Sequence, residues 1–419
     1  MAVTNVYGNG VNSTAGENTV VHYYDRAGVK AANRVNLYGQ FADRKSMPKK
    51  MGKTFKISKF LHMYDRSLDD AEFSAKGFLS NRSVEEASAS LAAATLIEGD
   101  GAKNKRSLHK VTMETTLARY GEMLDYTDEV ELFSEDAIQV RYREELGELA
   151  NSRMEDLIQI DMLATPTVMY AGDATTLEEI DEDSGVSYDL IRKAVRKLVR
   201  NRAKKNTQMV TGSTKIDTRT VCKAYYAVIG SNVKGDLENL TRGSGQETEY
   251  VYIPVHKYAA AGNLAEGEVG AMHEVRFIES ESAVVYAGQG AAVDAAGDTD
   301  AYTGLLSTVT YNDEAEVIAA RGTTGKVWDR DTDAYVNSGA GTPALKYFDA
   351  YPILFPTEGA FATVGLKGMD KIKFNAKSPS AVENSNPYGT TGFFSYNFFY
   401  AGLILEEEKL LKVLVSASA

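Results

Sequence analysis

The chain has 419 residues with a formal net charge of −12, and 43% of its residues are hydrophobic and 25% are charged. These values are typical of a globular protein long enough for two or three subdomains. The acidic balance argues against a dedicated nucleic-acid-binding protein, which usually carries a basic excess.

The single cysteine, Cys222, excludes an intramolecular disulfide, and we expect it to act as a small buried apolar residue. The N-terminal residues lack the basic and apolar regions of a signal peptide, and no stretch is apolar enough to span a membrane. We therefore expect a protein that folds in a cytoplasm, is not exported by the general pathway and has no membrane partner.

The first part of the chain predicts an arm and a projecting loop. Residues 1–20 are polar and rich in Gly, Asn, Ser and Thr, which indicates a flexible arm, and a short helix is expected over Tyr23–Phe41. Alternating apolar and polar residues predict strands at Phe55–Lys59 and Val111–Leu117. Between them the alternation is lost, apart from an Ala- and Ser-rich helical piece at Val84–Ala94. Two strands that bracket so long an excursion predict an extended loop.

The longest uninterrupted helical pattern runs from Ser134 to Ala164, and a strand-like run over Val111–Gly121 and Asp125–Val130 precedes it. Ser134 is expected to be the N-cap of this helix. Its buried face is predicted to consist of Ile138, Tyr142, Leu146, Leu149, Leu157 and Ile160. Its exposed face is predicted to consist of Glu144, Glu148, Asn151, Ser152 and Glu155. Such a helix would be about 45 Å long, more than a compact domain of this size usually needs.

A second amphipathic helix is predicted over Val186–Lys205. Its apolar stripe comprises Leu190, Ile191, Ala194, Val195, Leu198 and Val199, and its basic face comprises Arg192, Lys193, Arg196, Lys197, Arg200 and Arg202. We interpret the basic face as solvated surface that pairs with the many carboxylates of the chain; the alternative is a nucleic-acid contact.

The second half of the chain is dominated by predicted strands. They are Tyr225–Ile229, Val275–Ile278, Tyr351–Phe355, Phe361–Leu366, Phe393–Leu405 and Leu410–Val415. A short helix is expected near Asp236 and Leu237, and the Ala-, Gly- and Asp-rich segment Tyr286–Gly304 predicts a loop or inserted flap. Strands and helices dispersed along the whole chain favour an α+β fold.

Motifs that carry chemistry are missing from the sequence. The five histidines are scattered, and Gly322–Lys326 lacks both the first glycine and the final Ser or Thr of a phosphate-binding loop. Asp329–Asp333 resembles the opening of a calcium loop but is followed by Ala334 and Ala340 where Gly and Glu are required. Glu144 and Glu148 lie one helical turn apart, but such carboxylate pairs are expected by chance in a chain with 58 acidic residues and do not indicate a catalytic pair. We therefore predict a structural, non-enzymatic protein with no catalytic, cofactor-binding or metal-binding residues.

Several segments, in this order and spacing over nearly the whole chain, together resemble one family, the major capsid proteins of tailed bacteriophages related to the coliphage N-four type. The matching residues are Gln40-Phe41, Pro48–Phe55, Glu98-Gly99, Thr115–Gly121, Thr127-Asp128, Leu146-Gly147, Ala150, Asp156-Leu157, Thr167–Gly172, Asp236-Leu237, Gly267–Gly270, Val275–Glu279, Tyr351-Pro352 and Ala360-Phe361. The resemblance implies the Hong Kong 97-type capsid fold, with an N-terminal arm, an extended loop, a peripheral domain built on a long spine helix, and an axial domain.

The resemblance also implies a division of the chain. We expect an N-terminal arm at 1–52, the extended loop with its flanking strands at 53–112, the peripheral domain with the spine helix at 113–175, the axial domain at 176–265, peripheral strands and an inserted flap at 266–345, and axial and peripheral C-terminal strands at 346–419. Segments 286–304 and 323–341 depart from a compact family core and are expected to be insertions, flaps or sites for a decoration protein.

The implied function is a shell protein that self-assembles into hexamers and pentamers of an icosahedral phage head enclosing double-stranded DNA. Its expected partners are itself, portal, a separate scaffold protein, decoration proteins and, through weak non-specific contact, the packaged DNA. We expect it in the virion after assembly in the bacterial host cytoplasm. The alternatives are an encapsulin-like compartment shell and, from another class, a secreted adhesin or carbohydrate-active protein.

Overall fold

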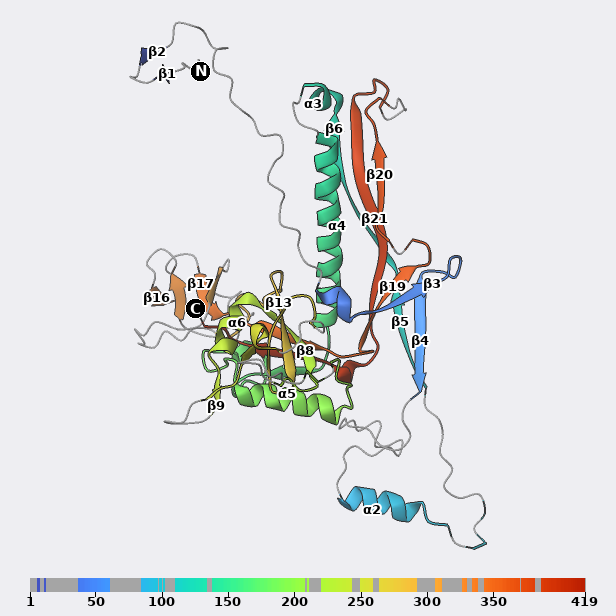
Figure 1. Ribbon diagram of the computed structural model, residues 1–419, viewed down its shortest axis with the longest axis vertical. Coiled ribbons are helices and arrows are strands. Elements are labelled where there is room, and N and C mark those ends of the chain that lie inside the picture. The colour runs from blue at the N-terminus through green and yellow to red at the C-terminus, as the bar shows by residue number, and fades with distance from the viewer. Residues whose placement is uncertain are drawn as a thin grey trace.

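The structure is a computed structural model. It describes residues 6–7, 11–12, 37–60, 84–96, 98–99, 101, 110–133, 138–207, 209–210, 220–242, 249–258, 264–291, 306–310, 326–329, 334–337, 343–369, 371–380 and 386–418. A long spine rises from a compact body, and a hairpin projects from the body in the opposite direction (Figure 1). Helices and sheets are both present throughout, which confirms the α+β class.

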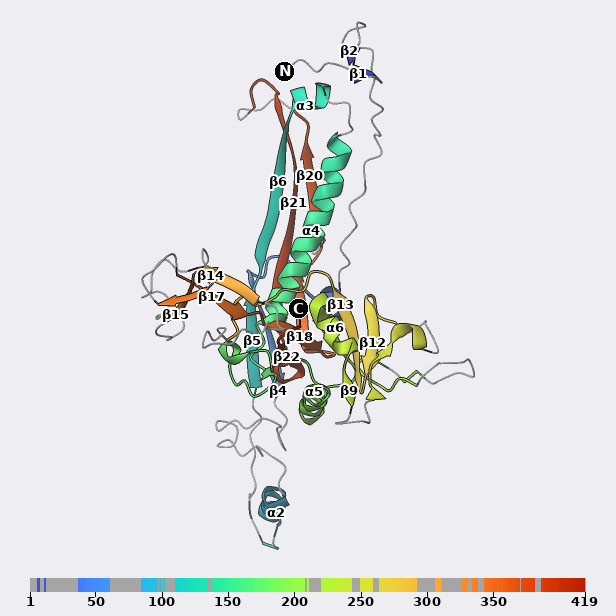
Figure 2. The same ribbon diagram turned by 90° about the vertical axis from the view of Figure 1, so that its left-hand side faces the viewer.

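The spine combines one long helix with one twisted sheet. The helix is α4 (Ile138–Leu163), and the central strand of the sheet is β21 (Thr391–Ile404). Strand β21 pairs on one side with β6 (Ala118–Thr127), and on the other with β20 (Lys373–Lys377) and β19 (Phe361–Leu366), beyond which lies β3 (Asp43–Met47). Helix α4 runs along one face of this sheet (Figure 2).

Period-two alternation in β21 explains why the helix packs there. Phe394, Tyr396, Phe398 and Tyr400 are all buried and belong to one core cluster with Leu146, Ala150, Ile158 and Met162 of α4. Successive side chains of a strand point to opposite faces, so these four aromatic residues form one apolar stripe. The core of the spine continues into the body, because Val228, Leu354 and Leu410 of the body sheet belong to the same cluster.

The compact body is built on a seven-stranded sheet. Its order is β11 (Ile253–Pro254), β12 (Glu268–Met272), β13 (Val275–Ser280), β8 (Tyr225–Gly230), β18 (Tyr351–Pro356), β22 (Leu410–Val415) and β7 (Val168–Tyr170). The β13–β8 and β22–β7 pairs are parallel. Helices α5 (Tyr188–Arg200) and α6 (Ser231–Glu238) contribute to the core on one face of this sheet. Ser187 caps α5 by accepting a hydrogen bond from the Leu190 amide at 3.2 Å.

The predicted projecting loop has a two-stranded base. Strands β4 (Thr54–Phe60) and β5 (Lys110–Thr116) pair antiparallel, with Thr54 opposite Thr116 and Phe60 opposite Lys110. Helix α2 (Val84–Ala93) lies beyond them at the far end of this projection (Figure 1). Both strands and this helix confirm the elements expected from the sequence.

Smaller elements complete the described chain. They are a sheet of β14 (Leu306–Thr310), β15 (Lys326–Asp329), β16 (Ala334–Asn337) and β17 (Pro343–Phe348); the pairs β1 (Val6–Tyr7) with β2 (Val11–Asn12) and β9 (Thr241–Arg242) with β10 (Glu249–Tyr250); helix α3 (Asp128–Phe133); and the 3₁₀ turns η2 (Tyr38–Phe41), η3 (Leu177–Glu179), η4 (Val255–Lys257) and η6 (Glu407–Lys409). Segment 323–341, expected to be an insertion, therefore supplies β15 and β16.

Several local expectations were wrong. Residues 128–130 begin helix α3 and do not continue a strand, and the part of Tyr23–Phe41 that is described forms the turn η2. Strand β13 pairs with β8, so residues 275–280 lie in the same sheet as residues 225–230; the expected division into domains stays a prediction. Cys222 is exposed although the adjacent Val221 is buried, because successive side chains of an extended segment point to opposite sides.

The remaining expectations lie outside the described residues: most of the arm at 1–20, the predicted helix before residue 37, the N-cap Ser134, most of the loop 98–106, residues 292–304 of the expected flap, and the motif residues 322–325 and 330–333.

Candidate assembly surfaces

The projecting hairpin buries little of its own surface. Along β4 and β5, exposed residues alternate with half-buried ones, and no residue of either strand is fully buried. An exposed cross-strand ion pair joins Lys56 Nζ and Glu114 Oε2 at 2.7 Å. Beyond the strands, Val84, Leu91 and Leu96 are 85%, 62% and 67% exposed. Exposed apolar side chains on a projection indicate a surface that another chain covers.

The spine presents apolar side chains as well. Phe374 of β20 and Met123 of β6 are 55% and 56% exposed. A cavity of about 360 Å³ lies between α4 and β20–β21, lined by Arg143, Leu146, Phe374, Asn375, Ala376, Phe394 and Ser395. Arg143 supplies a positive charge to the wall of this cavity, and its guanidinium makes a cation–π contact 5.4 Å from the centre of the Phe394 ring.

The predicted faces of α4 agree with the structure in part: Leu146 is buried and Glu144 and Asn151 are exposed, whereas Tyr142, Glu148, Leu149, Ser152 and Leu157 are half-buried. The side chain of Ile138 lies outside the described part of the chain, and two positions are the opposite of the prediction. Ile160, expected to be buried, is 56% exposed, whereas Glu155, expected to be exposed, is 1% exposed. Glu155 is buried because Tyr38 of η2 lies against the helix, and its backbone amide donates to Glu155 Oε1 at 2.5 Å. The neighbouring Gln159 is also buried, and it is hydrogen-bonded to the Tyr38 hydroxyl at 3.0 Å. These polar contacts anchor the turn η2 to the spine helix.

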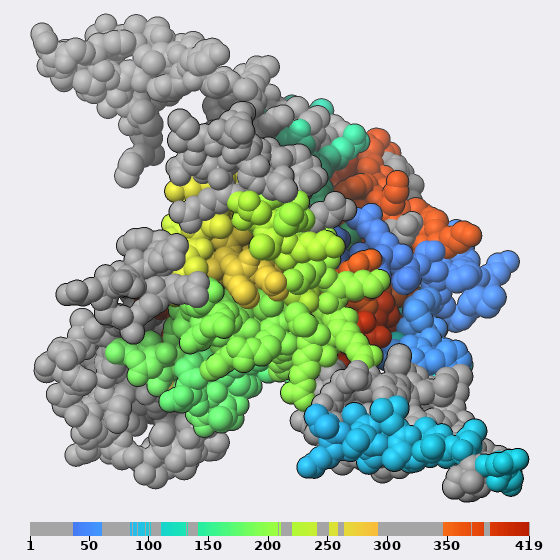
Figure 3. All heavy atoms as spheres, turned by 60° about the horizontal axis from the view of Figure 1, so that its bottom comes forward, coloured from blue at the N-terminus to red at the C-terminus, as the bar shows by residue number. Residues whose placement is uncertain are grey.

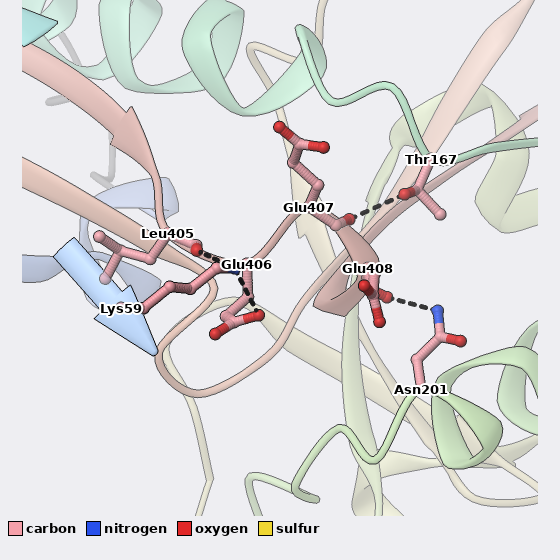
Figure 4. Close-up of polar contacts among 7 residues, drawn as sticks. All are labelled: Lys59, Thr167, Asn201, Leu405, Glu406, Glu407 and Glu408. Atoms are coloured by element: carbon pink, nitrogen blue, oxygen red, sulfur yellow. Dashed lines mark hydrogen bonds and ion pairs between the residues drawn. The ribbon is translucent and has the colours of Figure 1, made fainter. Parts of the chain in front are cut away.

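The connection between the two sheets is a junction of polar contacts. Residues 405–409, here called the sheet junction, link β21 of the spine with β22 of the body (Figure 4). Lys59 at the end of β4 donates to the Leu405 carbonyl at 3.1 Å and pairs with Glu406 Oε2 at 2.9 Å. The sheet junction therefore ties the projecting hairpin to both sheets.

The sheet junction also holds the ends of the two principal helices. Thr167, just past α4, donates its hydroxyl proton to the Glu407 carbonyl at 2.8 Å. Asn201, just past α5, donates through Nδ2 to the Glu408 carbonyl at 2.7 Å (Figure 4). Because an irregular segment needs partners for its backbone groups, these side chains stabilise the turn. They also fix the spine, the body and the hairpin relative to one another.

A buried ion pair lies in the body. Arg276 Nε of β13 is 3.8 Å from Glu268 Oε1 of β12, and the two side chains are 1% and 0% exposed. The Arg276 guanidinium also lies 5.8 Å from the centre of the Tyr258 ring. Burial raises the pKa of Glu268, while a backbone amide and Arg276 act to lower it. The enclosed position indicates a structural role for this pair.

The basic face predicted for α5 is exposed. Arg192, Lys193, Arg196 and Arg200 all face solvent, while Lys197 is half-buried and donates to the Val168 carbonyl at 3.1 Å. Burial lowers the pKa of Lys197. The apolar stripe is buried as expected except for Val199, which is 52% exposed. In Figure 3, where the lower end of the molecule comes forward, the green surface that includes α5 faces the viewer and is not covered by other parts of the chain.

No site for chemistry emerges from the part of the chain that the structure describes. Within these residues, no group of three or more His, Cys, Asp or Glu side chains could hold a metal ion, and no helix is long and apolar enough to cross a bilayer. Glu144 forms an ion pair with Arg141 at 3.7 Å along α4, as the background interpretation expected. The surfaces that stand out are suited to association.

Comparisons with known proteins give one consistent result. No family model matches the chain. The curated major capsid protein of Pseudomonas phage KPP21 is 29% identical over 415 residues, which cover 95% of this chain and 93% of that protein. This similarity confirms the resemblance to phage major capsid proteins.

Solved structures show the same fold at low sequence identity. The capsid of Ralstonia phage GP4 matches with a TM-score of 0.57 at 10% identity, covering 97% of both chains. The capsid of Cyanophage P-SCSP1u matches with a TM-score of 0.50 at 10% identity over 96% of this chain and 94% of that one. The capsid of Cyanophage Pam1 matches with a TM-score of 0.50 at 11% identity over 97% and 99%. The fold is that of phage capsid proteins.

Proposed function

Because this chain is a phage major capsid protein, we propose that it assembles into the hexamers and pentamers of an icosahedral head that encloses double-stranded DNA. The observation that carries the proposal is the hairpin that ends in exposed Val84, Leu91 and Leu96. Its own chain does not cover these side chains within the described residues, so a second copy is the natural partner. Phage capsid relatives favour a viral head over a compartment shell or a secreted adhesin.

The proposed architecture is of the Hong Kong 97 type. Residues 1–52 serve as the N-terminal arm and 53–112 as the extended loop. The peripheral domain comprises α4 and the sheet of β3, β6, β19, β20 and β21, and α4 is its spine helix. The axial domain comprises the seven-stranded sheet with α5 and α6. The continuous pairing of β13 with β8 supports this division, because a domain boundary at residue 265 would separate strands of one sheet.

Further partners follow from the same proposal. The shell meets a portal at one vertex, forms around a separate scaffold protein in the host cytoplasm, and contacts packaged DNA weakly. Decoration proteins bind the sheet of β14–β17, which the chain inserts between β13 and β18. The assembled protein then resides in the virion.

Negative-stain electron microscopy of the purified chain, with and without scaffold protein, tests the proposal. Closed shells or rings of five and six subunits are expected. The matched variant replaces Val84, Leu91 and Leu96 with Ser; because these side chains are exposed, its urea midpoint should equal that of the wild type while shells are lost. Small monodisperse particles from the wild type under every condition, with scaffold present, would contradict a shell-forming role.

A further inference from the structure

The basic face of α5 holds cations that the chain itself leaves unpaired. Arg192 is paired with Asp189 at 3.3 Å, one turn away on the same helix. Exposed Lys193 and Arg196, and Lys204 beyond the helix end, have no hydrogen-bond or ion-pair partner among the described residues. The expectation that this face pairs with the chain's own carboxylates therefore holds for Arg192, while Lys193, Arg196 and Lys204 are available to carboxylates of another molecule.

A concave acidic surface lies elsewhere on the same body. A cavity of about 320 Å³ is lined by Leu37, Glu266, Gly267, Glu268, Val269, Glu279, Glu281 and Ser282. Two of its carboxylates are neutralised locally, because Glu279 pairs with Lys234 at 2.7 Å and Glu268 with Arg276. Glu266 and Glu281 are exposed and have no such partner in the described ranges. We call this surface the acidic pocket.

Strand β13 separates the two surfaces. Its start is fixed beside the end of the α5 region, since Lys205 Nζ lies 2.7 Å from Glu274 Oε2. The strand then runs to Ser280, and the Glu279 amide donates to the Gly267 carbonyl at 3.0 Å, which places Glu266 and Glu281 at its far end. At about 3.3 Å per residue, Glu281 lies roughly 20 Å along the strand from Glu274. The acidic pocket is therefore at the end of the body nearest η2 and α4, while α5 forms the lower edge (Figures 1 and 2).

We propose that the basic face of α5 docks into the acidic pocket of a second copy of this chain within one ring. The inference rests on the proposed function and names the surfaces that meet. A ring is built from heterologous contacts, in which two different surfaces of each subunit meet and repeat around the axis. A convex basic helix at one edge and a concave acidic pocket at the opposite end have the complementary shapes and charges that such a contact requires.

Packaged DNA is the less favoured occupant of the basic face. DNA would neutralise Lys193 and Arg196 but would leave Glu266 and Glu281 without a partner, and the net charge of −12 on the chain would repel it. A second copy satisfies both surfaces at once.

Charge reversal tests the contact. The first variant combines Lys193→Glu with Arg196→Glu, the second combines Glu266→Lys with Glu281→Lys, and the third carries all four changes. Each of the first two should lose rings and shells in electron microscopy and sedimentation, because like charges then face each other. The third should regain them, because every copy again presents complementary surfaces. The matched control, Asp173→Lys with Asp183→Lys at exposed positions of the body outside both surfaces, should assemble as the wild type does.

The unassembled chain supplies the folding check. All of these side chains are exposed, so the urea midpoints of the variants should agree with that of the wild type. Failure of the wild type to form rings would refute the proposed function itself. Wild-type rings together with unaffected rings in the first two variants would overturn only the docking proposal. Equal loss in the control, no rescue in the third variant, or normal shells of the first variant that retain less DNA would overturn it as well.

Discussion

Gly402 of β21 sets how closely the spine helix approaches the long sheet. A methyl group at this position would overlap Asp161 Oδ2 and lie 2.8 Å from its Cγ and 2.9 Å from its Cβ. The Asp161 carboxylate could swing aside, but its Cβ is fixed to the helix backbone. Replacing Gly402 with Ala therefore forces a rotamer change, and it breaks the 2.8 Å hydrogen bond that the Tyr400 hydroxyl donates to Asp161 Oδ2.

The magnitude follows from three contributions. Overpacking costs about 1–3 kcal/mol, and loss of the hydrogen bond costs about 1 kcal/mol. Alanine in place of glycine within a strand returns about 0.5–1 kcal/mol. We expect Gly402→Ala to lower the free energy of unfolding by about 2 kcal/mol. In an Asp161→Gly background both the carboxyl group and the Cβ at position 161 are gone, and the same change should be neutral or slightly stabilising.

A double-mutant cycle measures this difference. Urea unfolding of the unassembled chain, followed by circular dichroism at the helix band, gives the four free energies, and the coupling between the two sites should be about 2 kcal/mol. Equal destabilisation by Gly402→Ala in both backgrounds would refute the reasoning, because the cost would then not arise from contact with Asp161.

Three further predictions concern the spine and the sheet junction. Burial raises the pKa of Asp161 above its usual value of 3.8, so the folded chain retains a proton that the unfolded chain releases. The free energy of unfolding should therefore fall as the pH rises from about 4 through the raised pKa. Asp161→Asn should flatten this pH dependence in urea titrations. Leu146→Ala, at a side chain that is 1% exposed, should lower stability by about 2–5 kcal/mol, whereas Ile160→Ala, at one that is 56% exposed, should change it by less than about 0.5 kcal/mol. Lys59→Met removes the partly exposed ion pair with Glu406 and should lower the free energy of unfolding by less than about 1 kcal/mol. It should also speed amide hydrogen exchange in β4.

Each of these predictions has a contrary result. A pH slope in Asp161→Asn equal to that of the wild type would assign the acid dependence to other carboxyl groups. Equal losses for Leu146→Ala and Ile160→Ala would mean that the buried face of α4 is assigned wrongly. Unchanged exchange in β4 of Lys59→Met would show that the sheet junction does not hold the hairpin. Lys56→Met, which breaks the fully surface-exposed pair with Glu114, is the control for the last experiment.

The candidate surfaces were only partly visible in the sequence. The basic face of α5 and the projecting loop both follow from residue patterns, and the structure confirms them as exposed. The acidic pocket could not be predicted, because Glu266 and Glu281 come together through the pairing of two strands around the Gly267 turn. The sheet junction left no signal either. Most hydrogen bonds of the sheet junction are accepted by backbone carbonyls, which every residue type carries.

The sequence by itself determined the elements whose pattern is local. Alternation over Phe55–Lys59 and helical spacing over Leu190–Leu198 each place apolar residues on one face, and burial of that face is favourable in any fold that contains the element. Only the tertiary structure decided which distant segments meet. Glu155 is buried because Tyr38, 117 positions away, lies on it, and β13 joins β8 because the pairing buries Phe277 and Ile278 in the body. Such contacts depend on the free energy of the whole packed molecule, which no local pattern records.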